Sequence, residues 1–172
     1  MISKKLNQAI CEQMRYEFYS AYYYLSMAAW LDAKNLKGFA NWYYVQTQEE
    51  KDHAKMMLDY LLRVGGQPEF LPIDQPPSNF ESTMDICRKT LEHEQLVTSK
   101  IYQLMDFAQE EKDYKTIQFL QWYVNEQTEE EENAQGLIER LTIAGNSEGG
   151  ILYMDSELAA RVYTPTTLAT AT

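Results

Sequence analysis

The stretch GGQPEFLPIDQPPSNFE, residues 65–81, decides how the rest of this chain can fold. It holds four of the five prolines, and neither side of it contains a comparable helix breaker until the region beyond Ala144. Proline removes a backbone hydrogen bond and clashes with the preceding turn, so helices end at such a stretch. A linker of about 16 residues reaches at most about 50 Å, and a helix of about 29 residues is about 43 Å long. The stretch can therefore run the full length of a helical bundle.

Polar turns divide the chain again on each side of this linker, near residues 32–35 and 110–113. Apolar residues repeat every three and four positions throughout, as in helices that pack together. Asn35 and Ser82 are predicted N-caps, and Gly65, Gly66 and Gly145 are predicted helix ends. We expect an all-α fold: a four-helix bundle with one long crossover between the second and third helices, and a short fifth helix. The predicted helices cover about 3–32, 35–64, 82–110, 113–144 and 151–162.

The composition is that of one soluble domain. The chain has 172 residues, 13% aromatic residues and a net charge of −11. We expect a single domain over residues 1–163 and a disordered tail over 164–172. The acidic charge argues against a nucleic-acid partner, and the absence of a long apolar run or leader-like segment argues against a membrane. We therefore expect a cytoplasmic protein, with Cys11 and Cys87 as reduced thiols.

Carboxylates interrupt the apolar face of each of the four long helices. Glu50 and His53 are three positions apart, which places both side chains on one helical face where one metal ion can bind both. Glu17 and Glu50 are equidistant from the first turn, and Glu94 and Glu130 are equidistant from the second. Because residues equidistant from a turn lie at the same height in an antiparallel pair, all four carboxylates should meet in one layer.

Such a layer needs cations. Neighbouring buried carboxylates raise each other's pKa, and removing each from water costs several kcal/mol. No Lys or Arg falls on the four inward faces to neutralise them. Bridging carboxylates can hold two metal ions about 3.5–4 Å apart, and an oxygen-rich site with one nitrogen suits iron or manganese. The alternative is that one or two of these side chains lie at the edge of the apolar face and reach water.

Several segments resemble the signatures of the non-haem bacterial and archaeal ferritins, in the same order. They are Glu49-Glu50-Lys51-Asp52-His53-Ala54, Leu91-Glu92-His93-Glu94, and residues 119–127 followed by Glu129-Glu130-Glu131. The resemblance extends from about Leu6 to about Val162. It implies a ferritin-like bundle, uptake and oxidation of Fe(II) by O2 or H2O2 (a ferroxidase activity), and storage of iron as a ferric mineral. It also implies a shell of 24 subunits, with the short fifth helix at the fourfold axes.

The resemblance also implies a role for particular residues. Glu17, Glu50 and His53 would bind one iron, and Glu50, as a bridge, would bind a second iron together with Glu94 and Glu130. Gln127 would lie near the oxidant, and Tyr24 would lie beside the paired site. A third iron position would fall on Glu49, Glu126 and Glu129, although these three lie off the inward faces.

Other functions remain as alternatives. Di-iron proteins of related fold place Glu-x-x-His on two helices, whereas this chain has one such motif, and we expect its other histidine, His93, on the surface. Lys51 stands where bacterioferritins carry their haem-binding methionine, so we expect no haem. A soluble di-iron oxygenase would need a substrate pocket beside the metals, and a metal-free helical interaction protein would bind no iron at all.

Overall fold

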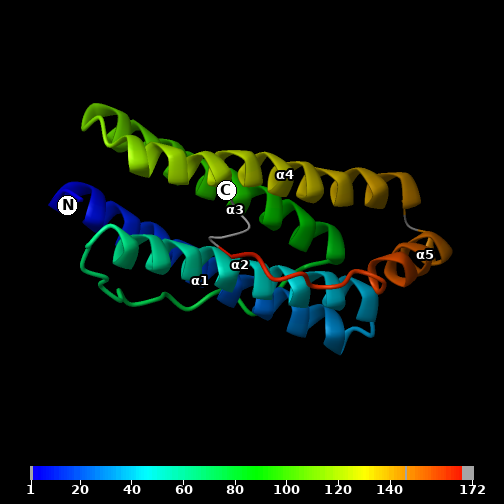
Figure 1. Ribbon diagram of the computed structural model, residues 1–172. Helices are drawn as coiled ribbons and strands as arrows, with labels where there is room; N and C mark the ends of the chain where they lie inside the picture. The colour runs from blue at the N-terminus through cyan, green and yellow to red at the C-terminus, as the bar shows by residue number, and fades with distance from the viewer. Residues whose placement is uncertain (1, 146, 168–172) are drawn as a thin grey trace.

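The computed structural model describes residues 2–145 and 147–167, and all of their regular structure is helical. Four long helices form the bundle and a short fifth helix closes one end (Figure 1). Their bounds are α1 Lys4–Ala33, α2 Lys37–Arg63, α3 Thr83–Glu110, α4 Tyr114–Ala144 and α5 Glu148–Leu158. The expected all-α bundle is confirmed. The fifth helix begins earlier than the predicted 151–162, because Ser147 accepts a hydrogen bond from the amide of Gly150 and so caps the start. It also ends earlier, at Leu158.

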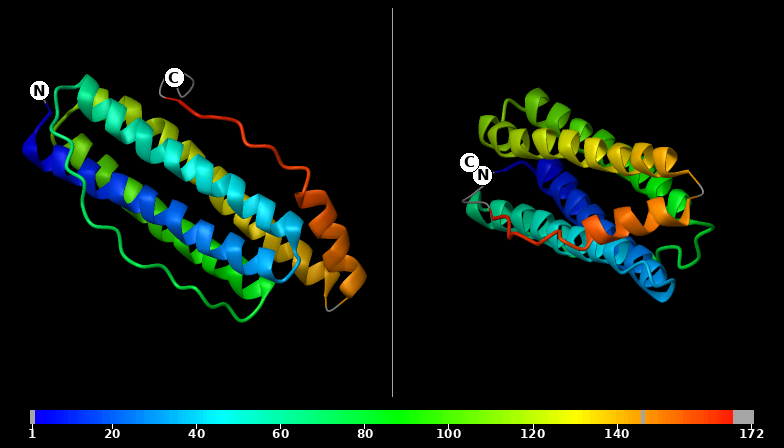
Figure 2. Two further views of the ribbon diagram at one scale, coloured as in Figure 1. Left: turned by 90° about the horizontal axis from the view of Figure 1, so that it is seen from below. Right: turned by 90° about the vertical axis from the view of Figure 1, so that its right-hand side faces the viewer.

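The proline-rich linker runs the length of the bundle beside α1 (Figure 2). Asn7 holds one end through hydrogen bonds with the backbone of Gln67, and Ser26 donates to the carbonyl of Pro77 near the other end. The linker therefore returns the chain to the end of the bundle where α2 starts. As a consequence α2 and α3 are parallel, whereas α1 with α2 and α3 with α4 are antiparallel, as expected.

The two short turns use residues in the left-handed region of backbone conformation. Asn35 has φ 62° and Lys112 has φ 54°. Our prediction of Asn35 as an N-cap was wrong. Asn35 lies in the turn, one residue before the cap position, and Leu36 occupies that position without a side-chain hydrogen bond. Asparagine tolerates this conformation better than most residues. Ser82 is the predicted N-cap of α3, and its hydroxyl accepts from the amide of Asp85.

Asp155 of α5 compensates for the missing cap on α2. Its carboxylate accepts hydrogen bonds from the amides of Gly38 and Phe39, at 2.9 Å each. Those amides are free at the first turn of a helix, where the helix dipole also favours a negative charge. Gly38 permits this approach, because a β-carbon there would lie 1.6 Å from the backbone oxygen of Asp155. The fifth helix is thus fixed to its own bundle.

The apolar core is divided into two parts. One part includes Leu6, Met14, Met57, Ile101 and Leu120, and the other includes Met27, Leu31, Phe39, Ile86 and Leu141. The residues between them on the inward faces are polar or acidic and nevertheless buried. A polar layer across the middle of the bundle is what the interrupted apolar faces predicted.

Beyond α5 the chain turns back along α2 (Figure 2). We expected disorder from Thr164 onward, yet Thr166 donates its backbone amide to Asp52 at 2.8 Å. The expectation for residues 168–172 lies outside the described residues. Within the described part of the chain, no helix is both long enough and apolar enough to span a membrane.

Candidate metal centre

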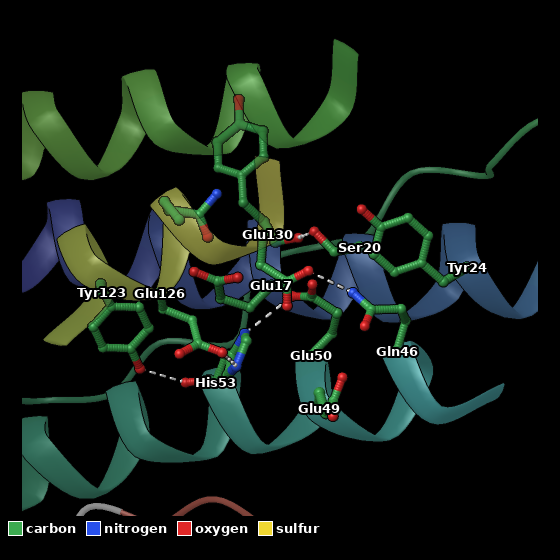
Figure 3. Close-up of polar contacts among 12 residues, drawn as sticks. Glu17, Ser20, Tyr24, Gln46, Glu49, Glu50, His53, Tyr123, Glu126 and Glu130 are labelled. Carbon is green, nitrogen blue, oxygen red and sulfur yellow. Dashed lines mark hydrogen bonds and ion pairs between the residues drawn. The ribbon is translucent and has the colours of Figure 1, made fainter. Parts of the chain in front are cut away.

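Three predicted ligands from two helices lie together in the polar layer (Figure 3). Glu17 comes from α1, and Glu50 and His53 come from α2; one ligand atom of each lies within 4.8 Å of the others. Glu50 Oε2 is 3.5 Å from His53 Nδ1. All three residues are at most 2% exposed. This geometry has the residue types and spacing to hold one metal ion, as the count from the first turn predicted.

The other two predicted carboxylates come from α3 and α4 and are also buried. Glu130 points toward Glu17 and Glu50 (Figure 3). Glu94 accepts hydrogen bonds from Tyr24 Oη and from Gln127 Nε2, the latter at 3.1 Å. The structure therefore brings Tyr24 and Gln127 to the same layer, on the Glu94 side.

Burial dominates the electrostatics of this layer. It raises the pKa of Glu17 and the pKa of Glu130 well above the ordinary value of a glutamate. The nearby charge of Glu50 raises the pKa of Glu17 further, and the charges of Glu94 and Glu50 raise that of Glu130 further. Burial also raises the pKa of Glu94, to about 7. Burial alone would lower the pKa of His53, but Glu126 and Glu50 outweigh it and raise that pKa well above 6.5. Without a cation, the layer at neutral pH must therefore keep protons or bear uncompensated charge.

Several buried polar atoms in this layer lack a hydrogen-bond partner among the described residues. They are Glu17 Oε2, Gln46 Oε1 and His53 Nε2, the last lying 3.7 Å from Glu126 Oε1. A buried polar atom without a partner costs about 1–3 kcal/mol, so such atoms are rare in folded proteins. Their clustering fits a site in which metal ions complete the contacts. Oxygen ligands with one imidazole suit iron better than a thiolate-seeking metal.

Three residues donate hydrogen bonds to the predicted ligands and were not predicted as site residues. Gln13 Nε2 donates to Glu17 at 2.8 Å, and Gln46 Nε2 donates to Glu130 at 2.7 Å. Tyr123 Oη donates to the backbone oxygen of His53 at 2.7 Å. Gln13 precedes Glu17 by one helical turn, and that spacing was a signal available in the sequence. Gln46 contacts Glu130 on a different helix, which no spacing within α2 indicates.

His93 is not the surface residue we expected. It is 7% exposed, and its Nε2 lies 2.7 Å from the hydroxyl of Ser20 on α1. Tyr23 and Tyr24 contact its ring edge to face. The expectation failed because α3 packs against α1 as well as α4, so a residue about 100° from Glu94 is still covered. Burial lowers the pKa of His93, which favours a neutral ring that packs rather than a charged one.

The residues proposed for a third iron position are less closely grouped. Glu126 lies beside His53 and is about a quarter exposed. Glu49 lies apart from the buried carboxylates (Figure 3) and makes an ion pair with Arg161 at 2.6 Å. Burial raises the pKa of Glu49, although Arg161 opposes this. Glu129 is exposed on α4. The structure thus brings Glu126 beside His53, pairs Glu49 with Arg161 and leaves Glu129 at the surface.

Comparisons with known proteins point to one family. Residues 7–144 match the family model described as ferritin-like domain. A bacterial non-heme ferritin of Staphylococcus haemolyticus is 39% identical over 95% of this chain and 98% of its own length, and one from Staphylococcus aureus is 36% identical with the same coverage.

Solved structures similar to this chain are also ferritins. An engineered closed form of the Archaeoglobus fulgidus ferritin is 43% identical, with a TM-score of 0.94 over 95% of this chain and 100% of that one. The open-pore ferritin of the same archaeon is also 43% identical, with a TM-score of 0.92 over 94% and 98%. With its four-helix bundle, single crossover and buried acidic layer, this chain belongs to the ferritin family.

Proposed function

We propose that the protein oxidises Fe(II) to Fe(III) at a paired site in the middle of the bundle and stores the product as a ferric mineral. The observation that carries this proposal is the buried layer of Glu17, Glu50, His53, Glu94 and Glu130, drawn from all four long helices. Four carboxylates and one imidazole supply more negative charge than the surrounding side chains neutralise. Iron entering as substrate would balance it.

The positions of the side chains support a division of roles. Glu17 and His53 hold one iron and Glu94 and Glu130 the other, with Glu50 as the bridge between them. Gln127 and Tyr24, which both donate to Glu94, position that carboxylate and lie beside the oxidant. Gln13 and Gln46 orient Glu17 and Glu130.

The electrostatics favour oxidation. Carboxylates in a poorly solvated layer stabilise Fe(III) more than Fe(II), because the interaction grows with the charge of the ion. Two irons together supply two electrons, the number required to reduce O2 to H2O2 or H2O2 to water. The protein thus needs no haem and no organic cofactor for this step.

Storage requires an enclosed space, which one bundle does not provide. We infer a shell of 24 copies in the cytoplasm, with Fe(II) and O2 or H2O2 as the small-molecule partners and no nucleic acid or membrane. Relatives named bacterial non-heme ferritin support this inference. A third iron would bind beside the paired site, and its proposed ligands are Glu49, Glu126 and Glu129.

A di-iron oxygenase with an organic substrate is less well supported. The described residues form a cavity of about 590 Å³ between α2 and α4, lined by aromatic residues that include Trp122 and Tyr123. These two rings also contact the His53 ring. None of the five proposed ligands lines the cavity. A substrate there would contact Trp122 and Tyr123, which separate it from His53 and the carboxylates.

The proposal is tested by Glu50→Ala, which removes the bridging ligand. We expect the initial rate of Fe(II) oxidation, followed by ferric absorbance, to fall by at least about 100-fold, because a ligand shared by both ions is lost. Glu111→Ala, which removes an exposed carboxylate in the turn between α3 and α4, is the matched control and should leave the rate unchanged. Equal rates for Glu50→Ala and the unmodified protein would show that oxidation occurs elsewhere.

A further inference from the structure

The segment that follows α5 lies against the outer face of α2 (Figure 2). Asn41 Nδ2 donates to the backbone oxygens of Leu158 and Arg161, at 3.2 and 3.0 Å. Tyr163 Oη donates to Asp52 Oδ2 at 2.6 Å. Contacts on both sides of Arg161 therefore fix the backbone from which its side chain extends.

The Arg161 side chain is held in a single position by three contacts. Nη2 lies 2.6 Å from Glu49 Oε2, and Nη1 donates to the backbone oxygen of Trp42 at 3.3 Å. The guanidinium carbon lies 4.7 Å from the centre of a Trp42 ring. The Arg161 and Glu49 side chains are 24% and 21% exposed. A planar guanidinium that stacks and donates in this way is better organised than an ordinary surface ion pair.

Glu49 is one of the proposed ligands of the third iron, and Glu126 is another. Among the described residues, Arg161 is the only Lys or Arg that makes an ion pair with either carboxylate. Glu126 Oε1 instead lies 3.7 Å from His53 Nε2. The positive charge that a third metal ion would bring to Glu49 is therefore already supplied by the chain itself.

We propose that Arg161 competes with the third cation for Glu49 and so sets the affinity of that position below that of the paired site. A metal ion that binds Glu49 and Glu126 has to break the ion pair between Glu49 and Arg161. Ions at the paired site displace protons, but among the described residues no Lys or Arg makes an ion pair with the carboxylates there. The paired site then fills first, and the third position fills only at higher concentrations of iron. The inference rests on the proposed function in one respect, that Glu49 and Glu126 accept a cation.

Displacement of the guanidinium does not require the segment to leave α2. The backbone contacts of Asn41 and the hydrogen bond between Tyr163 and Asp52 involve other atoms. Arg161 can swing away while the segment stays in place. The competition is therefore reversible and local, and a substitution at Arg161 should leave the bundle intact.

Binding of Zn²⁺ and Tb³⁺ to the full-length, metal-free protein tests this inference without any oxidation. The variant is Arg161→Gln, and the matched control is Arg88→Gln, which makes the same change of charge at an exposed position of α3. Titration calorimetry with Zn²⁺ gives the number of ions per chain and their affinities. Tb³⁺ luminescence sensitised by tryptophan gives a second count of bound cations at both positions, because Trp42 contacts Arg161 and Trp122 contacts His53.

We expect Arg161→Gln to bind the third Zn²⁺ about tenfold more tightly, because no charge-assisted pair has to be broken first. The two tighter ions should bind as before, and Arg88→Gln should match the unmodified protein. Arg161→Lys, which keeps the charge but not the planar contacts, should lie between them. The added affinity should disappear in the double variant Glu49→Gln with Arg161→Gln.

An unchanged third affinity in Arg161→Gln would overturn the inference, as would an equal gain in Arg88→Gln or the absence of a third ion from every variant. None of these results depends on whether Glu50→Ala loses oxidation, so failure here is distinguishable from failure of the proposed function. Circular dichroism of each variant, expected to be unchanged, verifies that the bundle is folded.

Discussion

Replacing Glu94 by glutamine should stabilise the metal-free protein at alkaline pH and not at acidic pH. Burial raises the pKa of Glu94 from 4.5 to about 7. Between these two values the folded state keeps a proton that the unfolded state has released. Stability is therefore highest below pH 4.5 and is lost as the pH rises through about 7. A glutamine of the same shape cannot ionise, so it does not incur that loss.

The size of the effect follows from the same shift. Moving one pKa from 4.5 to about 7 corresponds to about 3 kcal/mol at pH 8. Glutamine offers one acceptor oxygen to Tyr24 and Gln127 where the carboxylate offers two. The lost hydrogen bond lowers the free energy of unfolding of the variant by about 1 kcal/mol. The net gain of about 2 kcal/mol is equivalent to roughly 4–8 °C in Tm for a domain of this size.

Thermal unfolding of metal-free Glu94→Gln and unmodified protein at pH 5 and pH 8 tests this prediction. At pH 8 we expect the Tm of Glu94→Gln to be higher than that of the unmodified protein. At pH 5 we expect it not to be higher. Glu132→Gln, at an exposed position of α4, should show no such dependence on pH. Added Zn²⁺ should raise the Tm of the unmodified protein more than that of Glu94→Gln, which has lost a proposed ligand. A variant less stable by the same amount at both pH values would refute the reasoning.

Four further substitutions probe the site, its supports and the contact between α5 and α2. His53→Ala should weaken one of the two tight Zn²⁺ equivalents at least tenfold in titration calorimetry, because it removes the nitrogen ligand; equal affinities would exclude His53 as a ligand. Tyr24→Phe should lower the free energy of unfolding by about 1 kcal/mol through the lost hydrogen bond to Glu94. Gly38→Ala should cost about 1–3 kcal/mol, since the new β-carbon would meet Asp155. Gly136→Ala meets no atom within 4 Å and should be neutral or stabilising.

The sequence predicted the bundle and the acidic layer because both follow from regular helix geometry. A fixed rise per residue makes distance from a turn a measure of height, so Glu17 could be matched with Glu50 without coordinates. The linker could be assigned a direction because its length and that of the helices are both set by covalent geometry. Neither inference needs to know which side chains touch.

The features that the sequence did not predict depend on contacts between distant elements. His93 seemed exposed because one apolar face was assigned to each helix, whereas α3 meets two neighbours. Arg161 and Glu49 are far apart in the chain, and no periodicity connects them. The same is true of Asp155, which caps the start of α2 from a different helix. Such contacts require the path of the chain after α5 to be known.

The central claim is a pair of metal ions that share Glu50. Crystals soaked anaerobically in Fe(II) and measured at the iron absorption edge test it most directly, because anomalous scattering locates iron without assumptions about ligands. We predict two strong peaks per chain, about 3.5–4 Å apart, one beside Glu17 and His53, the other beside Glu94 and Glu130, and both in contact with Glu50. A single peak in this layer, or iron bound only outside it, would contradict the account.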